Sequence, residues 1–391
     1  MSEGSQIGST AEELLEEART ITGIRIVDTE AREPLTVLLD SYNRSAKFTP
    51  DGAVVKRSYL MRILRNRLCM LRDFAAHPEI HEIELRPPVI INALARTGST
   101  KLQKTLAATG DFNWLPYWMV LNSASETGEP NEDTSSRIAD VQAYADWFDT
   151  AAPDVKFGHP MLPFEPEEEA YIMNQSLLAS SLTGFAQAPE YTEWLATQDE
   201  GHQFLYVRDT LKYLIWQGLA DANKPFLLKC VKTVGLEEHM RRAYPLAHIV
   251  ATHRNPVSVV PSASKLGLLF RGAFSNQELD MGSRPVRMAA AMNASLDYRA
   301  GHPEERWLDI NYERIRTETR TVIEEIYAFA GLQPTAETFT NVEQWETANP
   351  QNKHGRWDYA AADFGFTDAD TREAFARYIQ WVETKGICAW D

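Results

Sequence analysis

Short apolar segments that alternate with helical stretches constrain the fold of this chain more than any other feature. The first, residues 89–94, reads Val-Ile-Ile-Asn-Ala-Leu, and comparable segments occupy residues 226–229, 248–253 and 307–310. A short segment without polar alternation is typical of a strand that is buried on both faces. Strands that alternate with helices form parallel sheets, so we expect an α/β fold in which helices flank a parallel sheet.

The chain before the first strand has a helical pattern. Thr10, followed by Glu12 and Glu13, is a typical helix start, and residues 11–84 carry mostly helical periodicity. We therefore expect two parts, an N-terminal helical region over residues 1–85 and an α/β core with C-terminal helical elements over residues 86–391.

Composition limits the partners and the compartment. The 39 Lys and Arg residues against 55 Asp and Glu give a net charge of −16, which disfavours a nucleic-acid partner and requires a local basic cluster for any anionic ligand. No signal peptide and no apolar stretch of about 18 residues is present, so we expect no membrane span. Three scattered cysteines suit a reducing cytoplasm and neither a disulfide framework nor a structural zinc site. The sequence leaves a homo-oligomer open.

The first candidate site is the turn that follows the first strand. A helix start with free backbone N–H groups, hydroxyls and two cations can hold a phosphate or sulfate. The alternative is that Thr97 and Ser99 only cap the helix. The candidate anion-binding residues are Arg96, Thr97, Gly98, Ser99, Thr100 and Lys101.

This turn is P-loop-like without being a Walker A loop. Ala93 and Gly98 have the Walker A spacing, but the required Lys is replaced by Ser99. The strand over residues 248–253 ends in His253 and Arg254 rather than in a metal-binding Asp. A nucleotide-dependent kinase of the P-loop type is therefore the disfavoured alternative.

The second candidate site follows the strand over residues 248–253. Asn255 is a good N-cap and Pro256 suits the first helical position, so Arg254 lies where a strand ends and a helix begins. That edge of a parallel sheet binds ligands. Ser262 comes two turns later, where it and Arg254 can converge on one phosphate; the alternative is that Arg254 is a surface ion-pair residue.

A third basic segment lies near the C-terminus. It combines permanent cations with a glycine that permits close backbone approach. The alternative is a solvated loop of an acidic protein. Its residues are Lys353, His354, Gly355 and Arg356.

Together these three motifs, in this order over residues 86–365, resemble the PAPS-dependent sulfotransferases, in particular the bacterial branch whose first loop reads Arg-Thr-Gly. The resemblance implies that PAPS (3′-phosphoadenosine 5′-phosphosulfate) is the co-substrate. Its 5′-phosphosulfate would bind the first loop, and its 3′-phosphate would bind Arg254 and Ser262 under the third segment. Tyr312 resembles the aromatic residue that contacts the adenine.

The acceptor side is expected in the segment over residues 159–169. Pro166 suits a first helical position, which would place three carboxylates in the first turn, and a solvated helix start is the alternative reading. The bacterial branch carries a His followed by Pro-Glu-Glu here, which implies a general base. We expect Glu168 in that role, with Glu167 and His159 behind it.

Lys229 resembles the strand-end Lys of the family, whose ammonium can stabilise charge on the transferred group. The family usually continues with small-Pro-x-His, whereas Thr233 stands here in place of His. The base therefore stays open between the acid cluster, His159 and another residue.

The sequence thus predicts metal-independent, in-line transfer of a sulfuryl group from PAPS to a hydroxyl, or an amine, of a small molecule. A non-catalytic nucleotide-binding protein is the second alternative to a sulfotransferase, beside the kinase.

Overall fold

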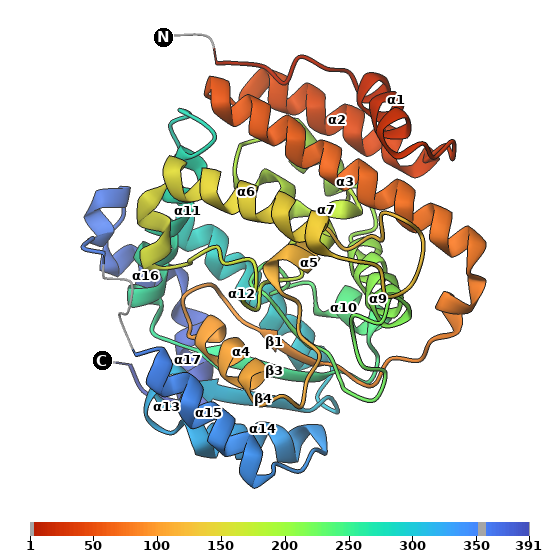
Figure 1. Cartoon of the computed structure of the whole chain (residues 1–391). Coiled ribbons are helices and arrows are strands. Elements are labelled where there is room, and N and C mark those ends of the chain that lie inside the picture. The colour runs from red at the N-terminus through yellow and green to blue at the C-terminus, as the bar shows by residue number, and fades with distance from the viewer. Residues whose placement is uncertain (1–3, 351–356, 391) are drawn as a thin grey trace.

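The predicted parallel sheet is present in the computed structural model, which describes residues 4–350 and 357–390 (Figure 1). Its strands are β1 (Val89–Asn92), β2 (Leu227–Cys230), β3 (His248–His253) and β4 (Trp307–Asn311), in the order β2-β1-β3-β4. Every pairing is parallel. The α/β fold class is therefore confirmed, and the strand limits differ by at most two residues from those expected.

Strand register brings the carboxyl ends of the strands to one edge. Val89 of β1 pairs with Leu227 of β2 and with His248 of β3. Because β1 is followed in space by β3 on one side and by β2 on the other, the chain leaves β1 at a point where the strand order switches. Ligands of open parallel sheets bind at such a point.

Both faces of the sheet are buried by helices. Ile90 and Ile249 belong to the cluster that contains residues of α3, α9 and α10, whereas Ile91 and Val250 pack with α4 and α14. The side chains alternate between these two clusters because successive residues of a strand point to opposite faces. This explains why the strands read as continuous apolar runs.

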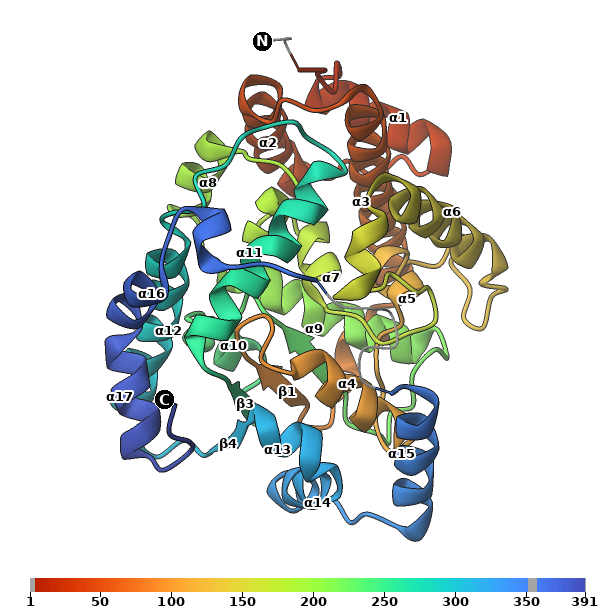
Figure 2. The same ribbon diagram turned by 90° about the vertical axis from the view of Figure 1, so that its left-hand side faces the viewer.

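The helices of the described residues lie around this sheet (Figures 1 and 2). The helices α1–α3 lie at one end of the molecule, and α13–α15 lie at the other. The first nine helices are α1 (Ala11–Thr22), α2 (Thr29–Ser45), α3 (Pro50–Ala76), α4 (Ser99–Ala108), α5 (Tyr117–Leu121), α6 (Ser135–Ala151), α7 (Ala170–Gln175), α8 (Pro189–Leu195) and α9 (Gly201–Trp216). The others are α10 (Glu237–Ala243), α11 (Pro256–Gly272), α12 (Arg284–Gly301), α13 (Tyr312–Thr317), α14 (Thr319–Ala330), α15 (Ala336–Ala348), α16 (Asp368–Ala374) and α17 (Ala376–Thr384). Short 3-10 turns are η1 (Pro78–Glu82), η2 (Pro153–Phe157), η3 (Ser180–Gly184) and η4 (Ala361–Phe364).

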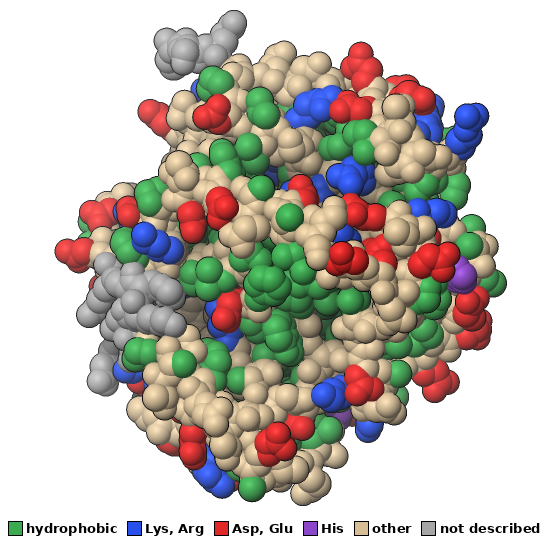
Figure 3. Space-filling model, in the orientation of Figure 1, with side chains coloured by type: hydrophobic (Ala, Val, Ile, Leu, Met, Phe, Trp, Pro, Cys, Tyr) green, Lys and Arg blue, Asp and Glu red, His purple; other side chains and the backbone are tan. Residues whose placement is uncertain are grey.

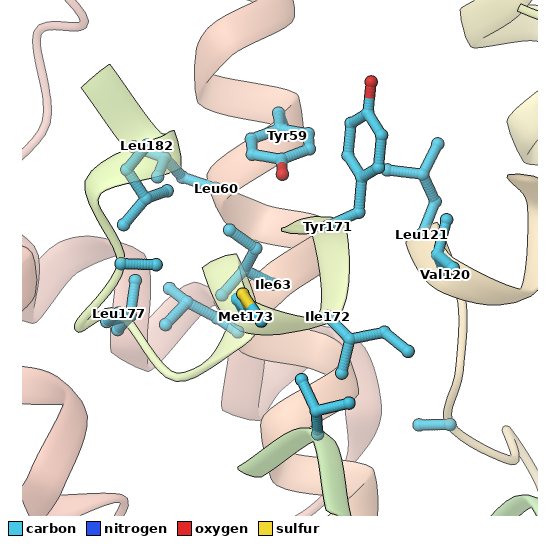
Figure 4. Packing of buried hydrophobic residues seen from close by; sticks show 14 of the residues in the cluster. Tyr59, Leu60, Ile63, Val120, Leu121, Tyr171, Ile172, Met173, Leu177 and Leu182 are labelled. Atoms are coloured by element: carbon cyan, nitrogen blue, oxygen red, sulfur yellow. The ribbon is translucent and has the colours of Figure 1, made fainter. Parts of the chain in front are cut away.

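The N-terminal helices begin as the sequence predicts. Thr10 caps α1 and forms a reciprocal capping box with Glu13, and α3 starts with Pro50 after the N-cap Thr49. These helices share one hydrophobic cluster with α5, α7, α9 and one face of the sheet. Figure 4 shows part of it, where Ile63 of α3 and Met173 of α7 lie close together. The N-terminal helices are therefore packed directly on the elements that carry the acidic segment.

The acidic segment differs from the expectation at its helix start. The helix α7 begins at Ala170, with Glu169 as its N-cap, and not at Pro166. Glu167 and Glu169 are buried rather than solvated. The reason is that their carboxylates bind groups of other segments, as described below, so they do not serve a helix dipole in water.

Candidate active site

The loop after β1 has a backbone conformation that requires a glycine at its centre. Gly98 is the N-cap of α4 with φ of 88°, and a Cβ there would lie 2.8 Å from Cδ2 of Tyr312. Arg96 also has a positive φ, 72°, which is uncommon outside glycine. The loop therefore makes a tight turn that directs the first N–H groups of α4 toward the sheet edge, as an anion cradle requires.

The polar side chains of this loop divide into two groups. The Thr97 hydroxyl lies 2.7 Å from the Leu94 carbonyl oxygen and 2.6 Å from the Thr252 hydroxyl of β3, so it braces the loop. In the described part of the chain, the hydroxyls of Ser99 and Thr100 have no hydrogen-bond partner. Helix capping by Thr97 or Ser99, the simpler reading of the sequence, is not observed, because no side chain caps α4.

Lys101 is engaged away from the loop. Its Nζ lies 3.0 Å from Oε1 of Glu346 on α15 and 3.4 Å from the Thr319 hydroxyl. This pairing compensates the charge of Lys101. Lys101 is therefore a weaker donor candidate than Arg96.

Arg96, Arg254 and Ser262 meet at the edge of the sheet. Nε of Arg96 donates to the Ser262 hydroxyl at 3.1 Å, and Nη1 of Arg254 donates to the Arg96 carbonyl oxygen at 2.8 Å. Burial, aided by the charge of Arg254, lowers the pKa of Arg96. Asn255 caps α11 and Pro256 is its first residue, as the sequence predicts. Residues far apart in the sequence thus bring the Arg96 guanidinium to the buried Ser262 hydroxyl and the Arg254 guanidinium to the backbone of the same loop.

Tyr312 covers this group. Its ring centre lies 4.2 Å from the guanidinium carbon of Arg254, and its edge closes over Gly98. The ring is held in place because Tyr312 is the first residue of α13, which Asn311 caps. The aromatic residue predicted to contact the donor base therefore lies directly against two other predicted donor residues.

The third basic segment, Lys353, His354, Gly355 and Arg356, lies outside the described residues. Trp357, directly after it, is described. Its ring lies 5.5 Å from the guanidinium carbon of Arg96, and its Nε1 donates to the Asp154 carbonyl oxygen at 3.0 Å. A Cβ at Gly158 would collide with this ring. The chain thus returns to Arg96 immediately after the basic segment.

The acidic segment forms two pairs beside β2. Oε2 of Glu167 lies 2.9 Å from Nε2 of His159, while Glu168 forms an ion pair with the ammonium of Lys229. Burial alone would raise the pKa of Glu167, but His159 and Lys229 outweigh burial and hold the pKa below its ordinary value. The second oxygen of Glu168 accepts the Val231 N–H at 3.2 Å. All four predicted catalytic residues are therefore brought together.

Glu169, which the sequence left among the possible bases and as a solvated residue of the helix start, is buried and joins the same network. Its Oε2 accepts the backbone N–H of Lys229 at 2.8 Å. Burial raises its pKa to about 7. A buried carboxylate that binds a strand N–H fixes the acidic segment to the end of β2, which the sequence pattern alone does not reveal.

Thr233 occupies the place where the family usually has His. Its hydroxyl donates to Oδ1 of Asn92 at 2.9 Å, and Nδ2 of Asn92 donates to Glu237 at 2.8 Å. Thr233 and Asn92 are buried. Thr233 thus ties the end of β1 to the loop after β2 and holds no free side chain toward the acidic segment.

A second buried network supports Arg254 from behind. The imidazole of His253 lies 2.9 Å from Asp309 and 2.8 Å from the Tyr378 hydroxyl, and Asp309 also pairs with Arg299. Burial opposes ionisation of Asp309, but His253 and Arg299 outweigh it and lower the pKa. The only sequence signal was that β3 ends in His253.

Neither a metal group nor a membrane helix is found in the described residues. Over residues 4–350 and 357–390, His, Cys, Asp and Glu side chains form no group of three that could hold a metal ion. In the same part of the chain, no helix has both the length and the apolar character needed to cross a bilayer. The donor set at the sheet edge, guanidinium groups with hydroxyls and helix N–H groups, instead suits sulfate or phosphate. A groove of about 1030 Å³ lies elsewhere, between α12, β4, α14 and α17.

Comparison with known proteins agrees with this architecture. The chain is similar to the solved structure of sulfotransferase STF9 from Mycobacterium avium, with a TM-score of 0.82 and 24% identity over 97% of both chains. It is also similar to sulfotransferase STF1 from Mycobacterium tuberculosis H37Rv, with a TM-score of 0.75 and 24% identity over 95% of this chain and 100% of that chain. No curated protein matches the sequence. The sequence model described as "Sulfotransferase family" matches residues 87–337, well over half of the 391 residues, and the chain therefore belongs to the sulfotransferase family.

Proposed function

We propose that this sulfotransferase moves a sulfuryl group from PAPS to a hydroxyl of a small-molecule acceptor. The observation that carries the proposal is the meeting of Arg96, Arg254 and Ser262 at the edge of a parallel sheet, beside the start of α4. A donor with two separated anionic groups fits this arrangement. The N–H groups of α4 would bind the phosphosulfate, and Arg254 with Ser262 would bind the 3′-phosphate.

The transfer requires no bond to the protein. The acceptor oxygen attacks sulfur, the bond from sulfur to the bridging phosphate oxygen breaks, and adenosine 3′,5′-bisphosphate leaves. Lys229 and Arg96 would neutralise the charge that develops on the transferred group and the leaving oxygen. Lys229 is paired with Glu168, so the two residues would separate for Lys229 to contact the transferred group and Glu168 the acceptor hydroxyl.

Two groups could take the acceptor proton. Glu168 keeps the primary assignment because it is the least buried of the three carboxylates and already adjoins Lys229. His159 is the alternative, because Glu167 binds its Nε2 and leaves Nδ1 without a partner among the described residues. A carboxylate that orients an imidazole is a recurrent arrangement for a general base.

The donor assignment is tested by binding. Adenosine 3′,5′-bisphosphate should raise the melting temperature, whereas ATP with Mg²⁺ should not, because Ser99 replaces the Walker Lys. Arg254→Ala should weaken bisphosphate binding by about 2–4 kcal/mol, since a charge-assisted contact is lost. Arg254→Lys should recover part of this loss.

Arg320→Ala is the matched control, because Arg320 is an exposed arginine that pairs with Glu324 on α14. It should leave bisphosphate affinity unchanged. Equal affinity in wild type and a folded Arg254→Ala variant would refute the donor site. Stabilisation by ATP with Mg²⁺ alone would favour the kinase.

A further inference from the structure

A group of three basic side chains lies beyond the donor loops. Arg271 is near the end of α11, Arg284 is the first residue of α12, and Lys232 lies in the loop after β2. Burial together with neighbouring cations lowers the pKa of Arg271 and that of Arg284, the latter to about 10. The guanidinium nitrogens of Arg284 lie 3.7 and 3.9 Å from the position of a Cβ on Gly267, so α12 places this side chain against α11.

These charges have no carboxylate partner in the described part of the chain. Arg271 donates from Nη2 to the Thr183 carbonyl oxygen at 3.0 Å, but its Nη1 is buried without a partner. Nε of Arg284 is likewise buried and unpartnered. Arg67, by contrast, is buried and binds Asp28 at 2.5 Å. In a chain with 55 acidic residues, a buried basic group without a counter-charge is costly unless a ligand supplies one.

The group is separate from the proposed 3′-phosphate site. Arg271 follows Ser262 by nine residues on α11, which corresponds to about 13 Å along a helix. It borders the acceptor side instead. The ring of Phe270 lies 5.7 Å from that of His159. The backbone N–H of Val231, the residue before Lys232, donates to Glu168 at 3.2 Å. Lys232 is also exposed, so a ligand can reach it.

We propose that Lys232, Arg271 and Arg284 bind an anionic group, a carboxylate or a phosphate, that the acceptor carries in addition to its reacting hydroxyl. The proposal rests on the proposed function for the identity of the ligand as acceptor. Two guanidinium groups and an ammonium provide the donors that such an anion requires. The rings of Phe185 and Phe270, with centres 5.4 Å apart, supply an apolar surface next to it.

The binding test uses simple anions, so it does not depend on the acceptor. The donor site is first filled with adenosine 3′,5′-bisphosphate, and inorganic phosphate or acetate is then titrated with calorimetry. Arg284→Gln should weaken binding of the preferred anion by about 10- to 100-fold, and the stronger of the two anions identifies the class. Equal binding by wild type and the variant would overturn the proposal.

Two controls keep the test interpretable. Arg377→Gln, at an exposed arginine of α17 that pairs with Asp297 of α12, should bind the anion like wild type. If Arg284→Gln fails to fold, Lys232→Gln replaces it, because Lys232 is exposed and its side chain forms no ion pair within residues 4–350 and 357–390. The same 10- to 100-fold criterion then applies.

The turnover test uses phenols of matched shape. With 4-hydroxyphenylacetate the Arg284→Gln variant should show a raised KM and an unchanged kcat, whereas the neutral 4-hydroxyphenylacetamide should give equal KM in both proteins. If wild type has the same KM for the amide as for the carboxylate, the proposal is refuted. Failure of the proposed function gives a different result, because then no bisphosphate binds and no phenol is turned over. In that case the anion titration is run without bisphosphate on Arg284→Gln and on Arg254→Ala, and it reports on each of the two sites separately.

Discussion

Two lysines are equally buried in different regions of the molecule, and they meet opposite surroundings. Lys56 of α3 and Lys229 of β2 each expose 1% of their surface. Lys56 lies among aromatic rings, with the centres of Tyr42 and Tyr59 both 5.1 Å from its Nζ, and burial lowers its pKa to about 7. Burial also opposes the charge of Lys229, but Glu168 and Glu167 outweigh it and raise the pKa.

The difference shows what maintains a buried cation. Aromatic rings lie near Lys56, but no carboxylate is paired with it in the described residues, so half of its charge is lost near neutral pH. At the strand edge, a carboxylate within bonding distance keeps the ammonium charged for use. The surroundings of Lys56 therefore disfavour its charged form, whereas those of Lys229 stabilise its charged form.

Removing the partner of Lys229 has the largest expected effect. Glu168→Gln should keep the shape of the site, lower kcat by about 10²- to 10⁴-fold and leave bisphosphate affinity nearly unchanged, because an amide cannot take the acceptor proton. It would also remove the one carboxylate that pairs with Lys229 among the described residues and leave only the charge of Glu167 nearby. Steady-state kinetics with a fixed acceptor measure this.

The outcome at His159 distinguishes the two base candidates. If His159→Ala abolishes turnover while Glu168→Gln stays active, His159 is the base and Glu167 orients it. Glu165→Gln is the control, because Glu165 pairs with Lys104 at 3.3 Å and has no place in the pairs beside β2. It should have little effect on kcat.

Replacing the other lysine should stabilise the protein. The folded pKa of Lys56, about 7, lies below the unfolded value of 10.5, so the unfolded chain binds more protons between these values. The cost of burying Lys56 is complete below pH 7 and fades as the pH rises to about 10.5. Lys56→Met should therefore raise the free energy of unfolding by up to about 5 kcal/mol at pH 6, with a smaller gain at pH 9. Urea unfolding at the two pH values measures the gain; a loss of stability at pH 6 would show that the rings hold the charged form.

Replacing Glu169 should give a smaller gain in the free energy of unfolding, with the opposite pH dependence. Its folded pKa of about 7 lies above the ordinary value of 4.5, so the folded chain keeps the proton longer. The cost appears as the pH rises through this interval and is complete above pH 7. Glu169→Gln, which can still accept the Lys229 N–H, should add up to about 3 kcal/mol at pH 8 and nothing at pH 4. A destabilised variant at pH 8 would mean that the carboxylate is ionised and needed.

Removal of metal ions by a chelator should have no effect on activity. If Lys229 and Arg96 supply the positive charge for transfer, activity with PAPS should survive EDTA unchanged. Loss of activity that Mg²⁺ restores would assign that charge to a metal and return the kinase to consideration.

The sequence predicted what depends on local pattern. Strand positions followed from apolar runs, and the starts of α1 and α11 followed from Thr10 and Asn255, because caps act within three residues. The bond from Arg96 to Ser262 joins residues 166 positions apart, and the Lys101–Glu346 pair also depends on tertiary structure. The helix start predicted at Pro166 is wrong for the same reason, because tertiary contacts decide it. The carboxylates that suited a helix N-terminus bind His159 and the backbone of β2 instead.

The strand order also sets a schedule for synthesis. The central strand β1 is complete at Asn92, but its neighbours β2 and β3 begin at Leu227 and His248, more than 130 residues later. At roughly 5–20 residues per second, the ribosome needs roughly 7 to 27 s to deliver the first neighbour. Until then β1 has two open edges, and the contacts of Arg96 with Ser262 and Arg254 cannot form, because Arg254 and Ser262 have not yet been made. An anion that binds at these residues therefore cannot guide the folding of the first half of the chain.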